Sequence, residues 1–232
     1  MALILSIESA TEVCSVALGK DGELLSLRES TLGRNHANNL ALYVQEILDE
    51  NDLYADELDA VAVSGGPGSY TGLRIGTAMA KSICYSLEKP MIAVGSLTAL
   101  AEIALEEFEA EIIEINNPHN ATLCPMIDAR RMEVYTQLFD MKLYKQSEIE
   151  AKIIDGSSFK GIENLVIFGD GAAKCTEILC VEHQFISVHS SARGMVRIAE
   201  GMFNSSNFVD VAYYEPYYLK DFVATTPKRK VL

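Results

Sequence analysis

The sequence predicts a mixed α/β protein, long enough for one large domain or for two small lobes. Three short strands open the chain and helices then alternate with strands, an order typical of a mixed α/β domain. The second half repeats this order more loosely, which indicates an internal duplication. An acidic and then Asn- and Pro-rich segment at 109–120 separates the halves. We therefore expect one lobe at 1–108 and a second at 109–232.

The first half shows clear strand and helix signals. Its first three strands are expected at 3–8, 13–19 and 23–29, with Lys20-Asp21-Gly22 as the turn before the last. A helix is expected over 36–50, where Leu40, Val44 and Leu48 recur at helical spacing. A strand at 60–64, a helix at 71–87, a strand at 91–94 and a helix at 97–107 follow.

The second half carries weaker versions of the same signals. Strands are expected at 122–128, 133–140, 165–168 and 185–188. Helices are expected at 172–179 and 192–203. The Thr-Thr-Pro-Lys-Arg-Lys segment at 225–230 is predicted to be a loose basic tail.

A glycine-rich segment between the strand at 60–64 and the helix at 71–87 is the most informative part of the chain. It reads Ser-Gly-Gly-Pro-Gly-Ser-Tyr-Thr-Gly over 64–72. Glycines allow another backbone or a ligand to approach closely, and a helix N-terminus presents unpaired N–H groups suited to an anion. Two interpretations follow: a closely packed strand-to-helix corner, or a vestigial phosphate loop made of Gly65, Gly66, Gly68 and Ser69.

The standard phosphate motifs fit this segment poorly. A P-loop requires a Gly-Lys pair five residues after its first glycine, whereas the first lysine here is Lys81, on the third turn of the helix. The dinucleotide fingerprint is half met by Gly66 and Gly68, but Thr71 stands at its third position. Spacing alone therefore favours the structural corner.

Composition limits the classes of function. The 232 residues are 49% hydrophobic and 22% charged, as in ordinary soluble globular proteins. The formal net charge of −14 makes the chain a poor binder of RNA or DNA by itself, because such binding depends on Lys and Arg neutralising phosphates. If nucleic acid is involved, we expect a partner to hold it.

The cysteines and the beginning of the chain predict a cytoplasmic protein. The cysteines are odd in number, form no C-x-x-C pair and lie mostly in apolar runs, so we expect buried free thiols in a reducing compartment. We find no basic leader and no apolar run long enough for a signal peptide or a membrane span. The five cysteines are Cys14, Cys84, Cys124, Cys175 and Cys180.

Side chains that could do chemistry do not assemble into a catalytic or metal set. The four histidines, His36, His119, His183 and His189, form no HExxH or HxxxH pair. Asp128 with Arg130 and Arg131 is either a substrate clamp or an ordinary ion pair, and Asp170 suits a turn as well as a ligand. We therefore expect no catalytic residue, no metal and no cofactor.

Several motifs together resemble the TsaB (YeaZ) family, and the resemblance covers nearly the whole chain. The glycine-rich segment and its continuation to 76 carry most of it. The others are Leu-Ser-Ile-Glu-Ser-Ala-Thr at 5–11, Asp-Ala-Arg-Arg-Met-Glu-Val-Tyr at 128–135, Gly-Asp-Gly-Ala at 169–172 and Pro-Tyr-Tyr-Leu at 216–219.

This resemblance implies a two-lobed fold of the actin, Hsp70 and sugar-kinase type, with ribonuclease-H-like lobes. It also implies a role in forming threonylcarbamoyladenosine at position 37 of tRNA. The expected part is that of a non-catalytic dimerisation and activating subunit, which pairs with a TsaD-type catalytic subunit and works with a TsaE-type ATPase. The chain departs from the family at Glu8, where Asp is usual. It also lacks the two metal-binding histidines of the catalytic relative, whose place is taken by 95–100.

Small residues recur every four positions on the helix at 71–87. Gly72, Gly76 and Ala80 form this stripe, which allows either internal packing or close approach of a helix from another subunit. The resemblance favours the second interpretation, in which the helices at 36–50 and 71–87 together contact another subunit. It also implies that the chain forms a homodimer when it is alone. The expected interface residues are Leu40, Tyr43, Gly72, Leu73, Gly76, Met79 and Ala80.

A different class of function stays open beside this one. An ATP-dependent phosphotransferase of the same actin-like superfamily would use the corner at Gly65 to Gly68 as a phosphate loop. A zinc glycoprotease is disfavoured, because the histidines lack metal-ligand spacing.

Overall fold

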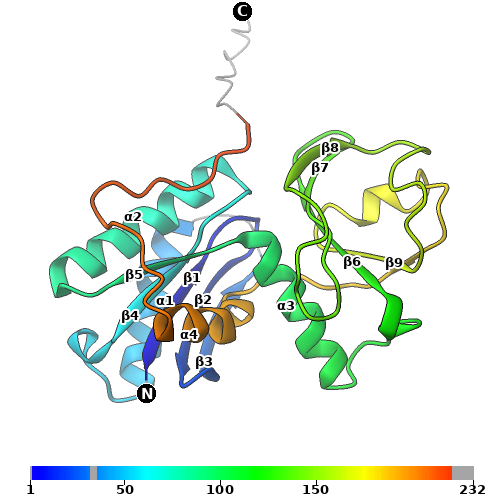
Figure 1. Ribbon diagram of the computed structural model, residues 1–232. Coiled ribbons are helices and arrows are strands. Elements are labelled where there is room, and N and C mark those ends of the chain that lie inside the picture. The colour runs from blue at the N-terminus through cyan, green and yellow to red at the C-terminus, as the bar shows by residue number, and fades with distance from the viewer. Residues whose placement is uncertain (1, 32–35, 221–232) are drawn as a thin grey trace, which may run out of the picture.

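The computed structural model describes residues 2–31 and 36–220. Two five-stranded sheets form two lobes, and helix α3 (Ser96–Glu109) lies between them (Figure 1). The basic tail expected at 225–230 lies outside the described residues.

The first sheet has the strand order β3-β2-β1-β4-β5. Its strands are β1 (Leu3–Glu8), β2 (Cys14–Lys20), β3 (Glu23–Ser30), β4 (Ala60–Ser64) and β5 (Met91–Val94). The first three pair antiparallel as a meander, and β4 and β5 run parallel to β1. This is the ribonuclease-H-like arrangement that the sequence resemblance implied.

The second sheet repeats this topology, in the order β8-β7-β6-β9-β10. Its strands are β6 (Thr122–Asp128), β7 (Glu133–Thr136), β8 (Glu150–Ile153), β9 (Leu165–Phe168) and β10 (His183–Phe185). Again three strands form an antiparallel meander, and the last two run parallel to the first. The predicted two-lobed α/β fold with an internal duplication is confirmed.

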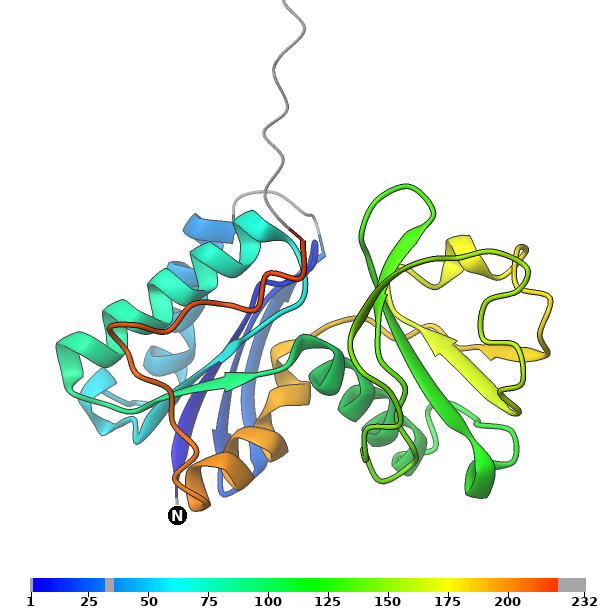
Figure 2. The ribbon, with the colours of Figure 1, turned by 45° about the horizontal axis from the view of Figure 1, so that its top comes forward.

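Helices cover both faces of the first sheet (Figure 2). On one face, α1 (His36–Glu50) and α2 (Tyr70–Leu87) pack against β-branched and leucine side chains such as Ile7 and Val63. Figures 1 and 2 place α4 (Val196–Asn204) on the other face, where alanines such as Ala60 and Ala62 leave room for it. The strands are apolar on both sides because both sides are covered.

Among the described residues, the second sheet has a helix on one face only. There α3 contributes Leu100, Ile103 and Ala104 to a core that includes Phe139 and Phe168. The other face is covered by loops, with the 3₁₀ turn η3 (Ala173–Cys175) among them. Two further 3₁₀ turns, η1 (Ala55–Glu57) and η2 (Pro118–Asn120), lie before β4 and β6.

The predictions for the second half were less accurate than those for the first. The helix expected at 172–179 is only the turn η3, because so short a segment gains little from its own hydrogen bonds and its Cys175 is used for packing. The strand expected at 133–140 ends at Thr136, and Phe139 pairs separately with Leu123. The strand β8 was not predicted.

After β10 the chain returns to the first lobe. The helix expected at 192–203 begins as the 3₁₀ turn η4 (Ala192–Met195) and continues as α4. At Gly194 a side chain would overlap the carbonyl oxygen of Ala99 on α3, so the turn lies directly on that helix. Residues 192–204 thus pack on the first sheet, although they come after the second sheet in the sequence. The lobe boundary expected between residues 108 and 109 stays a prediction.

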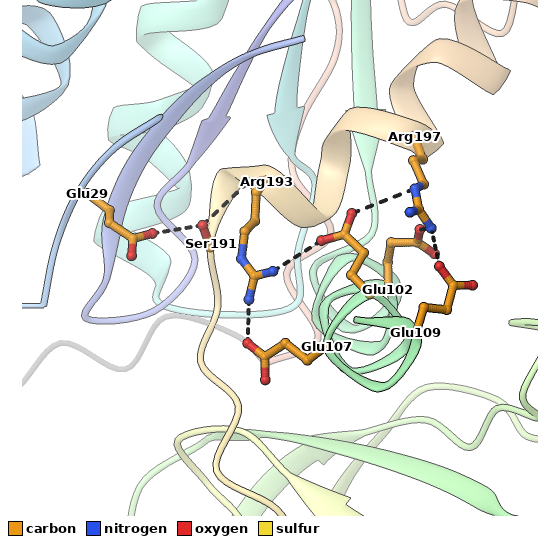
Figure 3. Close-up of polar contacts among 8 residues, drawn as sticks. Glu29, Glu102, Glu107, Glu109, Ser191, Arg193 and Arg197 are labelled. Carbon is orange, nitrogen blue, oxygen red and sulfur yellow. Dashed lines mark hydrogen bonds and ion pairs between the residues drawn. The ribbon is translucent and has the colours of Figure 1, made fainter. Parts of the chain in front are cut away.

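Two arginines join this returning segment to α3 (Figure 3). Arg193 pairs with Glu106 at 3.2 Å and also with Glu107. Arg197 pairs with Glu109 at 2.9 Å and with Glu102 at 3.4 Å. These acids lie on α3, so the network fastens η4 and α4 to the helix between the lobes.

Candidate functional site

The glycine-rich corner joins β4 to α2, and its backbone N–H groups bond to the protein itself. The N–H of Gly65 donates to the carbonyl of Val94 at 2.7 Å, and that of Gly66 to Ser96 Oγ at 3.1 Å. The N–H of Ser69 donates to the carbonyl of Ala10 at 2.6 Å. A phosphate would need donors of this kind free. Their engagement weighs against a phosphate loop, which stays a prediction.

The glycines of the corner allow the protein's own backbone to approach. Gly66 has φ of +95°, and a Cβ there would lie 2.5 Å from the carbonyl oxygen of Tyr217. At Gly68 a Cβ would overlap the carbonyl oxygen of Ala10. The corner is therefore packed between the turn after β1 and a segment near the end of the described chain.

The stripe of small residues on α2 faces the same turn, which corrects part of the interface prediction. A Cβ at Gly72 would overlap the carbonyl oxygen of Ser9, and a Cβ at Gly76 would overlap Ser9 Oγ. That hydroxyl donates to the Gly72 carbonyl at 2.9 Å. Ala80 is fully buried. The stripe therefore packs internally. Ser9 occupies the volume that side chains larger than hydrogen would fill at Gly72 and Gly76.

The apolar residues expected at the interface are also mainly covered within the chain. Leu40 and Leu73 are fully buried in the first lobe, while Tyr43 and Met79 are half-buried against the same core. The outward faces of α1 and α2 instead carry Leu42, which is 53% exposed, and Tyr85, which is 82% exposed. Arg74 and Ser82 are polar and lie at helical spacing from Tyr85. This pattern could have indicated from the sequence that the three residues share a solvent-exposed face of α2.

Glu8 ends β1 and lies buried beside the corner. It is 1% exposed, and its Oε1 accepts the N–H of Ala10 at 2.6 Å. Burial raises the pKa of this carboxyl to about 7, with a smaller contribution in the same direction from the negative charge of Asp170. Glu8 therefore titrates near neutral pH, and a carboxylate from the second lobe lies within electrostatic range of it.

The corresponding strand end in the second lobe is Asp128, and it is exposed. Asp128 Oδ1 accepts the N–H of Arg130 at 2.8 Å and pairs with Lys174. Asp170 accepts the N–H of Asp128 at 2.9 Å, and burial raises its pKa. The ion pair expected between Asp128 and its neighbouring arginines is absent from the described residues, where Asp128 pairs with Lys174 instead. The substrate clamp stays a prediction. Asp170 lies in the turn closed by the bond from the Ala172 N–H to the Gly169 carbonyl, and its side chain joins that turn to the end of β6.

Arg130 and Arg131 form the tip of the β6–β7 hairpin. Both are exposed, and their φ angles of 70° and 53° lie in the left-handed region. Non-glycine residues adopt this region mainly in tight turns, so the hairpin accounts for it.

The remaining candidates for metal or thiol chemistry lie apart. Within residues 2–31 and 36–220 no three His, Cys, Asp or Glu side chains are grouped as a metal would require. Four cysteines are buried and Cys180 is exposed, so the expectation of buried thiols holds for four of five. Burial raises the pKa of Cys14 and Cys84 to about 11, which keeps them protonated and unreactive. In the same part of the chain, no helix has the length and apolar character that a membrane crossing requires.

Comparisons with known proteins find a TsaD family model and relatives named TsaB. The family model described as "TsaD: tRNA N6-adenosine threonylcarbamoyltransferase" matches residues 30–174. The tRNA threonylcarbamoyladenosine biosynthesis protein TsaB of Haemophilus influenzae is 35% identical over 132 residues, which are 57% of this chain and 51% of that protein. The protein of the same name from Escherichia coli is 30% identical over 95% of this chain and 96% of its own length. The match thus spans about half of the first relative and nearly all of the second.

A solved structure shares the fold. YeaZ from Pseudomonas aeruginosa superposes with a TM-score of 0.79 at 23% identity, over 94% of this chain and 100% of that one. Both lobes are therefore found together in a known protein.

Proposed function

The chain belongs to the TsaB (YeaZ) family of tRNA threonylcarbamoyladenosine biosynthesis proteins, and on that premise we propose that it is a non-catalytic subunit of a tRNA threonylcarbamoyl transferase complex. In this proposal it binds and activates a TsaD-type catalytic subunit, and a TsaE-type ATPase joins the pair. The modified tRNA is bound only by the assembled complex. The isolated chain pairs with a second copy of itself.

The packed glycine corner is the observation that carries the non-catalytic role. In the alternative phosphotransferase interpretation, this corner would receive a phosphate. Here the N–H groups of Gly65, Gly66 and Ser69 bond within the chain, and the backbone of Tyr217 lies against Gly66. Glu8 is buried and accepts a backbone N–H, so it is not presented to a ligand. These features favour binding of a protein partner over binding of a nucleotide.

The outward face of α1 and α2 is the surface we propose for the partner. Leu42 and Tyr85 are both large and exposed, and the helices beneath them are held rigidly by the first sheet. Aromatic side chains on rigid elements are common energetic centres of protein interfaces. The buried stripe of Gly72, Gly76 and Ala80 supports this face indirectly, by holding α2 close to the sheet.

The charge of the chain supports indirect binding of tRNA. A net charge of −14 repels a phosphate backbone at long range, so the isolated subunit is expected to bind tRNA weakly. A catalytic partner with a basic surface would supply the affinity.

Charge substitutions on the outward face test the proposal. Leu42→Glu and Tyr85→Glu should each weaken binding to a TsaD-type subunit of the same source at least about tenfold, because each places a charge in a desolvated contact. Binding is measured by sedimentation of the mixed subunits, and modified tRNA is measured in the reconstituted reaction. Ile112→Glu is the matched control, since Ile112 is 71% exposed just after α3, away from this face.

Two outcomes would contradict the proposal. The first is that Leu42→Glu and Tyr85→Glu both bind the partner and support tRNA modification as well as Ile112→Glu does. This result would show that the outward face of α1 and α2 is not the interface. Turnover of ATP by the chain alone, lost on Glu8→Ala, would favour the phosphotransferase instead.

A further inference from the structure

The last described part of the chain, Val209–Lys220, forms a strap across the first lobe. In Figures 1 and 2 it is the red segment that runs along α2 from the region of α4 to the top of the lobe. It makes no helix or strand of its own, yet it is held at several points. The strap therefore has an ordered path without regular secondary structure.

The strap is fixed to the first lobe by backbone and aromatic contacts. The N–H of Val209 donates to the Met91 carbonyl at 2.9 Å, and the N–H of Tyr217 donates to the Gly65 carbonyl at 2.8 Å. The rings of Tyr218 and Tyr70 lie 4.8 Å apart. The strap thus reaches the glycine corner and covers it.

The final residues of the strap contact the second lobe. Leu219 packs against the core that α3 shares with the second sheet. Lys220 pairs with Glu133 at the start of β7, and its Nζ lies 5.9 Å from the centre of the Tyr135 ring. One short segment therefore touches the corner of the first lobe and the hairpin base of the second.

The strap acts at a different place from α3. The chain crosses between the lobes twice, through α3 and through the return from β10 to η4, and the arginines of η4 and α4 join these two crossings. In Figure 2 the end of the strap lies at the top of the first lobe on the side facing the second, while α3 crosses below it. Between these connections, Glu8 and Asp170 bring carboxyl groups of the two lobes within electrostatic range.

We propose that the strap is a latch between the lobes, with the contact of Lys220 and Leu219 on Glu133 and the second-lobe core as its releasable end. When this end is attached, the lobes are held at the paired crossings of α3 and η4 and also at the strap. When it is released, they can rotate about α3. The latch needs no partner, so it stands or falls independently of the proposed function.

The distance between the lobes tests the latch. Spin labels are placed on the exposed Cys180 in the second lobe and on Tyr54→Cys, an exposed site in the first lobe, in the full-length protein. The four buried thiols are protected from labelling. Pulsed dipolar spectroscopy then reports the populations of short and long distances.

Charge reversal should open the latch, and a second reversal should close it again. Lys220→Glu is expected to lower the ratio of short to long distances by about two- to fivefold, the size typical of an exposed ion pair. The double variant Lys220→Glu with Glu133→Lys should return the ratio to that of the parent. Lys142→Glu, at an exposed lysine of the second lobe, is the control for net charge.

Three results would overturn the latch. They are an unchanged distribution in Lys220→Glu, an equal change in Lys142→Glu, and a change in Lys220→Glu that the double variant fails to reverse. Leu219→Ser supplies a second approach, since it removes the apolar part of the contact and should also lengthen the distances.

Discussion

The two lobes have the same strand order but cover the ends of their parallel strands differently. In the first lobe, β4 leads into the glycine corner and the long helix α2, and both pack against the turn after β1. In the second lobe, β9 leads into Gly169-Asp170-Gly171 and only a short 3₁₀ turn. One topology thus supports a rigid helix layer in one case and a layer of loops in the other.

Both corners are closely packed, since a Cβ at Gly169 would also overlap the carbonyl oxygen of Met126, but they differ in what covers the strand end. The first lobe buries Glu8 and Ser9 beneath α2, whereas the second leaves Asp128 exposed at the matching strand end. A flat, rigid helix surface is suited to binding a partner, and a sealed corner is unsuited to binding a small ligand. The two lobes therefore differ in stability and ionisation in ways that can be measured.

The largest expected difference concerns the glycines. Gly72→Ala places a Cβ over the Ser9 carbonyl oxygen and should destabilise the fold by more than about 3 kcal/mol, because neither backbone can move. Gly171→Ala in the second lobe meets its nearest atoms at 3.0 Å and should cost less. Urea unfolding measures both.

Gly201→Ala is the control for these glycine variants. Gly201 lies in α4 with nothing within 4 Å of an added Cβ, so alanine should stabilise the helix by up to about 1 kcal/mol. Equal losses in Gly72→Ala and Gly171→Ala would show that the two corners are packed alike.

The second difference is the response to pH. The pKa of Glu8 rises from 4.5 to about 7 in the folded protein, so between these values the folded state binds more protons than the unfolded state. The stabilising effect of protonated Glu8 is complete below pH 4.5 and is lost as the pH rises through about 7. At pH 8 the buried carboxylate should cost about 3 kcal/mol.

Glu8→Gln tests this dependence. The variant should be more stable than the parent at pH 8, and its stability should fall less steeply between pH 5 and pH 7. Asp128→Asn, at the matching position of the second lobe, should not flatten this part of the profile. If the stability of Glu8→Gln depended on pH in the same way as that of the parent protein, the pH response would come from other groups.

The smallest effect of the three is expected where the returning segment meets α3. Arg193→Met removes half-buried ion pairs with Glu106 and Glu107 and should cost about 1 to 3 kcal/mol, since it leaves partly desolvated carboxylates without a partner. Thermal unfolding measures this loss. Arg28→Met removes the more exposed pairs with Glu46 and Glu50 and should cost less than about 1 kcal/mol. Equal losses would show that the bracing of α3 is no stronger than a surface contact.

Much of the fold could be predicted from local sequence patterns. The helix α1 was predicted with its observed bounds because its apolar residues recur with a single clear period. The strands β1, β4 and β9 were predicted because each is a short, mainly apolar run, and nearly all of their residues are buried. These signals lie within the segment that forms the element, so no distant contact is needed to detect them.

Other features depended on contacts between distant parts of the chain. Strand β8 lies at a sheet edge, has no buried residue and shows no alternation of burial, and it exists because β7 pairs with it. The helix expected at 172–179 was prevented by packing of its residues into the second core. Local propensity could not reveal either outcome.

The orientation of α2 shows the same division most clearly. The sequence alone determined that Gly72, Gly76 and Ala80 lie on one side of a helix, since that follows from 3.6 residues per turn. Only the tertiary structure decided what that side meets. Its partner is Ser9, 63 positions away from Gly72. A periodic pattern specifies a face, but the atoms that cover it are chosen by the packing of the whole lobe.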